Sequence, residues 1–300
     1  MPNNNECFRR RRPAVFWFMI LAAALVLVWG TKAALLSGNL FREATGPKLG
    51  LVRIEGTIVD PEKIDDWIKE LREDDDVKGV VVRINSPGGV VGPSQEIYEA
   101  VKRLAGKKPV VASMGAVAAS GGYYVACPAT EIIANPGTLT GSIGVKAELV
   151  NAQNLLDKVG VTFFSVTSGK LKDAGCPFRP MTDEEKAYFE SMVQDLKRQF
   201  VRDVAAGRKM DPARIDELAD GRAYSGEQAL AVGLVDKMGG LEDAFDDLKK
   251  LCNLEGKVPL LTGPKKEKRW LRDLLESSLG HLDLDSLMNN TFAGARVSYE

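Results

Sequence analysis

The chain has 300 residues, 45% of them hydrophobic, and its 40 basic side chains nearly balance 41 acidic ones. This composition excludes a disordered polymer, and the balanced charge gives no reason to expect a nucleic-acid partner. A single histidine, His281, excludes a multi-histidine metal site within one chain. Hydrolytic chemistry would therefore need that histidine or another base.

The amino terminus combines a basic block with an apolar run. Residues 1–12 end in four consecutive arginines. The apolar run that follows reaches the lower limit of the length that a membrane-spanning helix needs, and residues 13–36 are predicted to be a membrane anchor. The arginines predict a cytoplasmic stub, with the rest of the chain on the other side of the membrane. A cleaved signal peptide is the rival interpretation, but no clean A-x-A site is present and Lys32 interrupts the candidate region. Residues 37–48 are then a polar tether.

The next segment, residues 49–257, alternates strand and helix patterns and predicts one α/β domain with right-handed crossovers. The predicted strands are 51–54, 79–84, 109–114, 131–134, 161–166 and 233–236, and the predicted helices are 61–71, 93–104, 182–204, 226–230 and 241–251. The run 79–84 is apolar except at Arg83, which is typical of strands buried within parallel sheets. Residues 258–300 form a tail with a basic run and an amphipathic helical spacing, which is either a packing helix or a membrane-surface or inter-subunit helix.

Two loops carry candidate chemistry. Ser120 lies in A-A-S-G-G between a buried strand and a helical stretch, which is similar to a nucleophile elbow and leaves free N–H groups at the helix start. A plain helix cap is the alternative. The second loop is N-S-P-G-G at 85–89, whose glycines suit an oxyanion hole, although Ser86 is itself a possible nucleophile and a purely structural turn remains open.

A serine nucleophile needs a base. His281 lies in the tail among leucines, away from the α/β pattern, so a histidine triad is disfavoured and a lysine base is the known alternative. Lys170 and Lys172 both lie in S-G-K-L-K-D at 168–173. A lysine base must be neutral, which requires desolvation. Periodicity does not choose between the two lysines.

Taken together, these motifs resemble the signal peptide peptidase A family, a group of membrane-anchored serine proteases with the Clp protease and crotonase-like fold. The matching segments are N-S-P-G-G at 85–89, A-S-G-G-Y-Y at 119–124, T-G-S-I-G-V at 140–145, S-G-K-L-K-D at 168–173, Gly226 with Ala229, and G-L-V-D at 233–236. They run in order from about residue 49 to 251. The resemblance implies a spiral of β-β-α units preceded by one transmembrane helix.

The resemblance also implies roles for particular residues. Ser120 becomes the nucleophile, and the S-G-x-x-K-D pattern makes Lys172 the general base in place of Lys170. Gly121 and Gly89 become the oxyanion hole, and Ser142 or Ser168 would orient the lysine. No cofactor is implied.

The short, single-repeat form of this family implies a homo-oligomeric ring in which serine and lysine meet across neighbouring subunits. The implied substrates are remnant signal peptides and other hydrophobic membrane-associated peptides. The implied location is the bacterial inner membrane, with a cytoplasmic amino terminus and an extracytoplasmic catalytic domain.

Two rivals share the fold. A crotonase-type acyl-CoA enzyme would use carboxylates and would rarely carry an export anchor. A catalytically silent membrane scaffold would keep the fold without needing both Ser120 and Lys172.

Overall fold

The computed structural model describes residues 18, 21–29 and 46–264. Residues 18 and 21–29 are helical, and most of the predicted anchor at 13–36 lies outside the described residues. None of the helices within those ranges combines the length and apolarity that a bilayer span needs. His281 and most of the predicted tail also lie outside the described part.

Strands and helices alternate from residue 48 onward, which confirms the predicted α/β class. The strands are β1 (Lys48–Glu55), β2 (Val77–Ser86), β3 (Val110–Ala119), β4 (Glu131–Ala134), β5 (Leu139–Gly141), β6 (Ala223–Ser225), β7 (Lys237–Met238) and β8 (Leu260–Gly263). The helices are α3 (Glu62–Glu73), α4 (Val91–Ala105), α5 (Gly121–Ala126), α6 (Gln153–Val159), α7 (Asp183–Arg208), α8 (Pro212–Leu218), α9 (Gly226–Ala231) and α10 (Leu241–Leu251).

These strands form one mixed sheet in the order β6-β5-β3-β2-β1-β8. All pairs are parallel except β5 with β6, and β4 branches from β3 to pair with β7. Two strands therefore pair with the same edge of β3, β4 near its start and β5 near its end. The loops that follow β2 and β3 consequently come together at one edge of the sheet, because parallel neighbours end on the same side.

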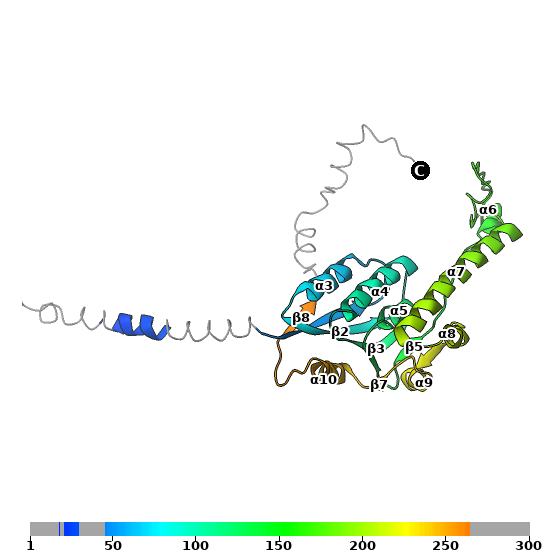
Figure 1. Ribbon diagram of the computed structural model, residues 1–300. Coiled ribbons are helices and arrows are strands. Elements are labelled where there is room, and N and C mark those ends of the chain that lie inside the picture. Colours follow the sequence, from blue (N-terminus) through cyan, green and yellow to red (C-terminus); the bar gives the residue numbers. More distant parts are fainter. Residues whose placement is uncertain (1–17, 19–20, 30–45, 265–300) are drawn as a thin grey trace, which may run out of the picture. The chain divides into compact units, whose positions relative to one another are not determined.

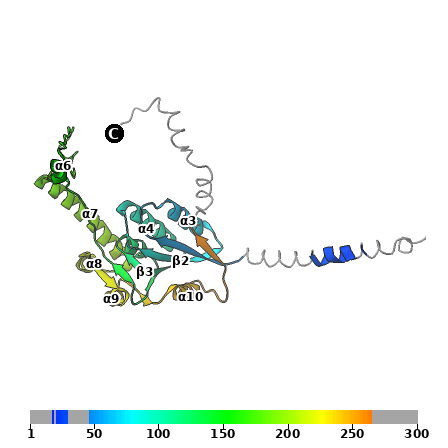
Figure 2. The same ribbon diagram turned by 180° about the vertical axis from the view of Figure 1, so that it is seen from behind.

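Helices cover both faces of the sheet. The helices α3 and α4 pack on one face and α10 on the other (Figures 1 and 2). Within β1, Val52 and Ile54 belong to the core cluster that includes residues of α3 and α4. Leu49 and Leu51 belong to the second cluster, which includes residues of α10. A strand buried on both faces must be apolar at successive positions, which is why Val80, Val81 and Val82 follow one another in β2. Arg83, the next residue, is half-buried and donates from Nη1 to Ser113 Oγ at 2.8 Å.

The sheet continues beyond the predicted domain end at residue 257. β8 pairs with β1 in parallel register, with Leu49 opposite Leu260 and Val52 opposite Gly263. Residues 260–263 therefore belong to the α/β fold and not to a tail. An edge strand of four residues carries too little alternation for sequence periodicity to identify it.

An arm of residues 146–181 separates β5 from α7. Its one helix, α6, has no buried residue, and both views show it beside the N-terminal end of α7 (Figures 1 and 2). Only the C-terminal half of α7 has a buried apolar face, through Phe200, Val201, Val204 and Ala205. In the N-terminal half, Tyr188 and Met192 are exposed, so the helix predicted at 182–204 has a buried apolar face over only part of its length.

Two predicted strands are wrong. Residues 161–166 have no strand structure, and Phe164 and Val166 are 84% and 100% exposed. Their apolar pattern indicated burial, but no described segment of the chain pairs with them. Residues 233–236 form a turn, and the strand follows at β7, because Gly233 takes a φ of +82° and ends the preceding helical segment.

Candidate active site

The turn after β2 is held by one side chain and by backbone hydrogen bonds to Ile58. Ser86 is fully buried, and its Oγ accepts a hydrogen bond from the Gly88 N–H at 3.1 Å. Ile58 donates its N–H to the Gly88 carbonyl at 2.9 Å, and Val90 donates to the Ile58 carbonyl at 2.8 Å. Ser86 therefore has a structural role in this turn, and its burial argues against its use as a nucleophile.

Ser120 lies at a sharp bend between β3 and α5. Its φ of 51° and ψ of −120° fall in a region that residues with a Cβ rarely occupy. The Ser120 N–H donates to the Gly141 carbonyl at 2.8 Å, which ties the bend to β5. Strain of this kind marks the nucleophile elbow, where a strand-to-helix turn exposes a serine hydroxyl. The Ser120 side chain is partly exposed, and its Oγ has no hydrogen-bond partner among the described residues.

Two glycine-rich backbones meet beside Ser120. A Cβ placed on Gly88, whose φ is +101°, would lie 2.7 Å from the Gly121 nitrogen and 3.0 Å from the Ser120 Cβ. A Cβ on Gly121 would lie 3.3 Å from the Gly89 nitrogen and 2.6 Å from Ser94 Oγ. The Gly89 and Gly121 N–H groups thus lie near each other, and neither has an acceptor within residues 46–264. Such a pair of free donors is what a developing oxyanion requires.

Ser120 lines two cavities, and both are also lined by Gly89, Val91, Gly144 and Val145. The smaller one is an apolar pocket, lined also by Ser94, Gln95, Gly121, Tyr124, Leu196 and Phe200. The larger one is a polar groove, lined also by Thr57, Pro87, Gly88, Ser142, Lys146, Val193, Gln194, Lys197, Ala219, Asp220 and Gly221. An apolar pocket and a larger groove therefore adjoin the same hydroxyl.

Of the two predicted supporting serines, only Ser142 lies at this site. It lines the polar groove, has a φ of 50°, and donates from Oγ to the Gly221 carbonyl at 3.3 Å. Ser168 lies on the exposed arm and lines neither cavity. The structure brings Ser120, Gly89, Gly121 and Ser142 together.

Lys172 is not part of that group. It lies on the arm, is exposed, and lines neither cavity that contains Ser120. Its Nζ makes no hydrogen bond or ion pair with any residue that the structure describes. Lys170, by contrast, binds Glu184 at 2.8 Å, and this hydrogen bond raises the pKa of the Lys170 ammonium. The two neighbouring lysines are therefore in different environments.

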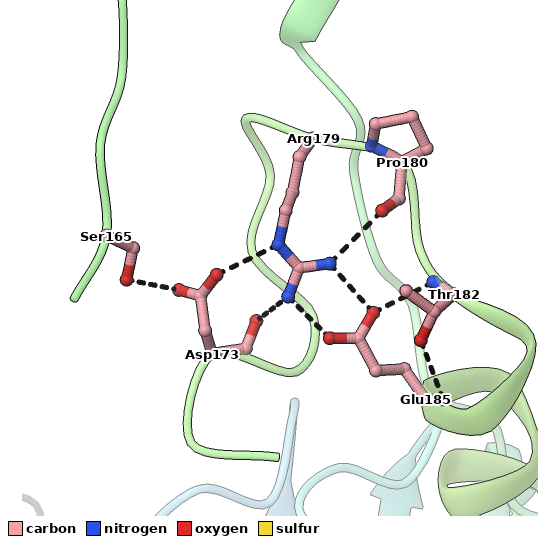
Figure 3. A network of polar contacts seen from close by, with 6 residues as sticks. All are labelled: Ser165, Asp173, Arg179, Pro180, Thr182 and Glu185. Carbon is pink, nitrogen blue, oxygen red and sulfur yellow. Dashed lines mark hydrogen bonds and ion pairs between the residues drawn. The ribbon is translucent and has the colours of Figure 1, made fainter. Parts of the chain in front are cut away.

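Several polar residues near these elements carried no sequence signal. Lys146 and Lys197 line the polar groove, where they pair with Glu148 at 2.6 Å and Asp216 at 2.8 Å. On the arm, Arg179 joins Asp173 to Glu185 (Figure 3). Thr182 and Glu185 form a capping box at the start of α7, and Glu185 is also bound by Arg179. This second contact has no sequence signal, because an ion pair in a loop has no periodicity.

Comparison with known proteins identifies similar sequences. Peptidase family S49 matches residues 102–255, which is more than half of the chain. The chain is 42% identical over 217 residues to "Putative protease slr0021" of Synechocystis sp., covering 72% of this chain and 78% of that protein. It is 43% identical over 186 residues to "Putative signal peptide peptidase SppA" of Enterococcus faecium, covering 61% of this chain and 54% of that one.

Two further similarities are more distant. The chain is 35% identical over 223 residues to "Serine protease SPPA, chloroplastic" of Arabidopsis thaliana, covering 74% of this chain and 32% of that protein. The chain thus spans about half of the Enterococcus protein and about a third of the Arabidopsis one. Among solved structures, a point mutant of ClpP1 from Listeria monocytogenes aligns with a TM-score of 0.45 and 17% identity, covering 65% of this chain and 93% of that one.

Proposed function

Because the chain belongs to peptidase family S49, we propose that it is a serine endopeptidase in which Ser120 and Lys172 form the catalytic dyad. The observation that carries this proposal is the strained Ser120 elbow beside two free backbone N–H groups. A silent scaffold would not need a serine in this conformation, since the backbone strain lowers the free energy of unfolding and a scaffold gains no function from it.

The proposed reaction begins with neutral Lys172, which accepts the Ser120 proton while Oγ attacks a peptide carbonyl carbon. The Gly89 and Gly121 N–H groups hold the oxyanion of the tetrahedral intermediate. Protonated Lys172 then gives its proton to the leaving amine, so that the C–N bond breaks and an acyl-enzyme remains. A water that Lys172 deprotonates finally hydrolyses the ester.

The environments of the lysines support Lys172 as the base. Lys170 is held by Glu184, which favours its charged form, and the groove lysines Lys146 and Lys197 are each paired with a carboxylate. Lys172 has no such partner among the described residues. A lysine must be neutral to act as a base, so the proposal requires a surface that covers Lys172 and removes it from water.

We assign that surface to a neighbouring copy of the chain in a homo-oligomeric ring. The arm that carries Lys172 exposes several large apolar side chains, among them Val150, Leu155, Phe164 and Val166, which contact with a neighbouring copy would remove from water. In such a ring the arm of one subunit would bring Lys172 to the Ser120 of the next, and Ser142, which lines the polar groove, would orient it.

The proposed substrates are hydrophobic peptides, including cleaved signal peptides. Two features support this choice. The pocket beside Ser120 is lined by Val91, Tyr124, Leu196 and Phe200, which suit an apolar side chain. The Enterococcus relative carries the name of a signal peptide peptidase. An anchor at residues 13–36, with the catalytic domain outside the cytoplasm of a bacterium, would keep the site near such membrane-bound peptides.

The test is hydrolysis of a fluorogenic hydrophobic peptide by the full chain in detergent. We expect Ser120→Ala to reduce the rate to background while leaving the thermal melting temperature near that of the wild type. Equal rates for the two proteins would reject the protease and favour the silent scaffold of the same fold.

A further inference from the structure

The loop that carries Lys172 has little regular structure to hold it. Residues 168–175 form turns between an irregular exposed segment and the start of α7. The Lys172 N–H donates to the Gly169 carbonyl at 3.1 Å, which shapes the turn without attaching it to the rest of the fold. A general base must be held to within a fraction of an ångström of its target. Some other contact must therefore fix this loop.

Arg179 makes that contact at the residue directly after Lys172. Its Nε donates to Asp173 Oδ2 at 2.9 Å, and its Nη2 donates to the Asp173 main-chain carbonyl at 2.9 Å (Figure 3). The guanidinium thus binds both the side chain and the backbone of Asp173. On the other side, Ser165 Oγ donates to Asp173 Oδ1 at 3.2 Å, so two segments of the arm converge on one carboxylate.

The guanidinium of Arg179 also binds a buried carboxylate, that of Glu185. Its two terminal nitrogens bind the two carboxylate oxygens of Glu185, with Nη1 to Oε2 at 2.9 Å. Glu185 is 3% exposed, and its Oε2 also accepts the Thr182 N–H at 2.9 Å within the capping box. These hydrogen bonds, first from Arg179 and then from the backbone, lower the pKa of Glu185 to about 2, so the Glu185 carboxylate is ionised at any physiological pH.

Helix α7 joins Glu185 to the buried core. Glu185 lies in the first turn of α7, and 15 residues later Phe200 begins the buried half of the same helix. Phe200 packs edge-on against Tyr124 of α5, at a centroid distance of 4.7 Å. Tyr124 and Phe200 both line the pocket of Ser120. One helix therefore connects the nucleophile's own pocket with the loop that carries the proposed base.

From this chain of contacts we propose that Arg179 is a positioning residue, which fixes the main chain beside Lys172 to the N-terminus of α7. Arg179 itself does not contact the Lys172 side chain, so it acts through Asp173. Its planar fork is suited to this task because it binds a carboxylate bidentately while a third nitrogen remains for another acceptor. The inference rests on the proposed function, since it requires Lys172 to be the base.

The test compares Arg179→Gln with Arg198→Gln in the full chain. Arg198 forms an exposed ion pair with Asp195 on α7 and lines neither cavity, so it controls for the loss of one arginine that pairs with this helix. We expect Arg179→Gln to lower kcat by about 100-fold, the order that a misplacement of about 1 Å costs, with KM nearly unchanged. Arg198→Gln should have wild-type kinetics, and Arg179→Lys should recover part of the lost kcat.

Assembly and stability are measured in parallel by light scattering and thermal melting. A low kcat with wild-type assembly size and melting temperature supports positioning, whereas a loss of kcat that follows a loss of assembly or of folded protein overturns it. If Arg179→Gln does not fold, Arg179→Lys replaces it, because one ammonium keeps the positive charge beside Glu185 but cannot reproduce the hydrogen bonds to both Asp173 and Glu185. A wild-type kcat in Arg179→Lys would then reject the proposal.

Lys172→Ala separates the two ideas. If Lys172→Ala is inactive and Arg179→Gln has wild-type kcat, the positioning role is wrong while the dyad stands. If Lys172→Ala remains active, the dyad itself is wrong, whatever Arg179 does.

Discussion

Gly88 illustrates how a single residue controls the proposed oxyanion hole. Its φ of +101° disfavours any side chain, and an added Cβ would lie 2.7 Å from the Gly121 nitrogen, which is closer than real Cβ atoms approach. The two glycine backbones can therefore meet only because Gly88 has no Cβ. The N-S-P-G-G motif thus carries a steric requirement in addition to supplying a donor at Gly89.

We expect Gly88→Ala to lower kcat by about 100-fold, the order found when one oxyanion donor is lost. The added methyl group would push the Gly121 N–H out of position. Steady-state kinetics on the fluorogenic peptide measure the effect. Gly92→Ala is the matched control, because a Cβ at Gly92 meets nothing within 4 Å. Similar kinetics for both variants would contradict the steric account.

The two arm lysines provide a second prediction at this scale. Lys172→Ala should abolish peptide hydrolysis, because no other unpaired amine is offered to Ser120 in the proposed mechanism. Lys170→Ala should retain activity, because it removes only an exposed ion pair with Glu184, of a kind that contributes little to stability. Rates on the same peptide decide between them. The reverse result would transfer the role of base to Lys170.

At the scale of elements, α3 and α4 meet at an unpaired carboxylate. Asp65 on α3 has a buried Oδ1 without a hydrogen-bond partner among the described residues. Burial, and then the negative charge of Glu96 on α4, raise the pKa of Asp65 to about 6, and Arg103 opposes them only in part. The folded state therefore binds this proton more tightly than the unfolded chain, whose ordinary value is 3.8.

The sign of the pH dependence follows. Below about pH 4 both states are protonated and Asp65 costs nothing, whereas above about pH 6 the fold must hold an ionised, poorly solvated carboxylate. Asp65→Asn should therefore raise the free energy of unfolding at pH 8 by about 1 kcal/mol, after allowance for partial exposure, and the gain should disappear towards pH 4. Denaturant titrations at several pH values measure it, and Asp66→Asn controls for net charge. A gain that is independent of pH would reject this explanation.

At the scale of the whole molecule, the proposed dyad can form either within one chain or between two. Lys172 lies outside both cavities that contain Ser120, and the arm around it exposes apolar side chains. These facts favour a site shared between copies, and a mixing experiment distinguishes the two arrangements without further structural work.

We expect Ser120→Ala and Lys172→Ala chains to complement each other when they are co-expressed with different tags and purified through both. Random mixing leaves about one site in four with an intact serine from one chain and an intact lysine from its neighbour, so about a quarter of the wild-type rate should return. Each variant alone sets the background. If mixed assemblies form without any recovery of activity, the dyad lies within one chain.

Local patterns in the sequence were sufficient for much of the fold and for the local geometry around Ser120. The run at 79–84, apolar except at Arg83, predicted a strand buried on both faces, and small residues between a strand and a helix predicted the elbow at Ser120. These features depend on neighbours within a few residues, so their signals are contained in short segments. The predicted strand at 161–166 failed for the opposite reason, since an apolar pattern indicates that a segment favours burial but not what covers it.

By itself, then, the sequence determined the α/β class, the strand-to-helix elbow at Ser120 and the glycines suited to bind an oxyanion, because each is a property of local chain geometry. Only the tertiary structure decided that Gly88 and Gly121 touch, that Ser142 and not Ser168 lies in the polar groove, and that Arg179 links Asp173 to a buried Glu185. Contacts of this kind join segments far apart in the chain or loops without periodicity, and they depend on how the elements pack.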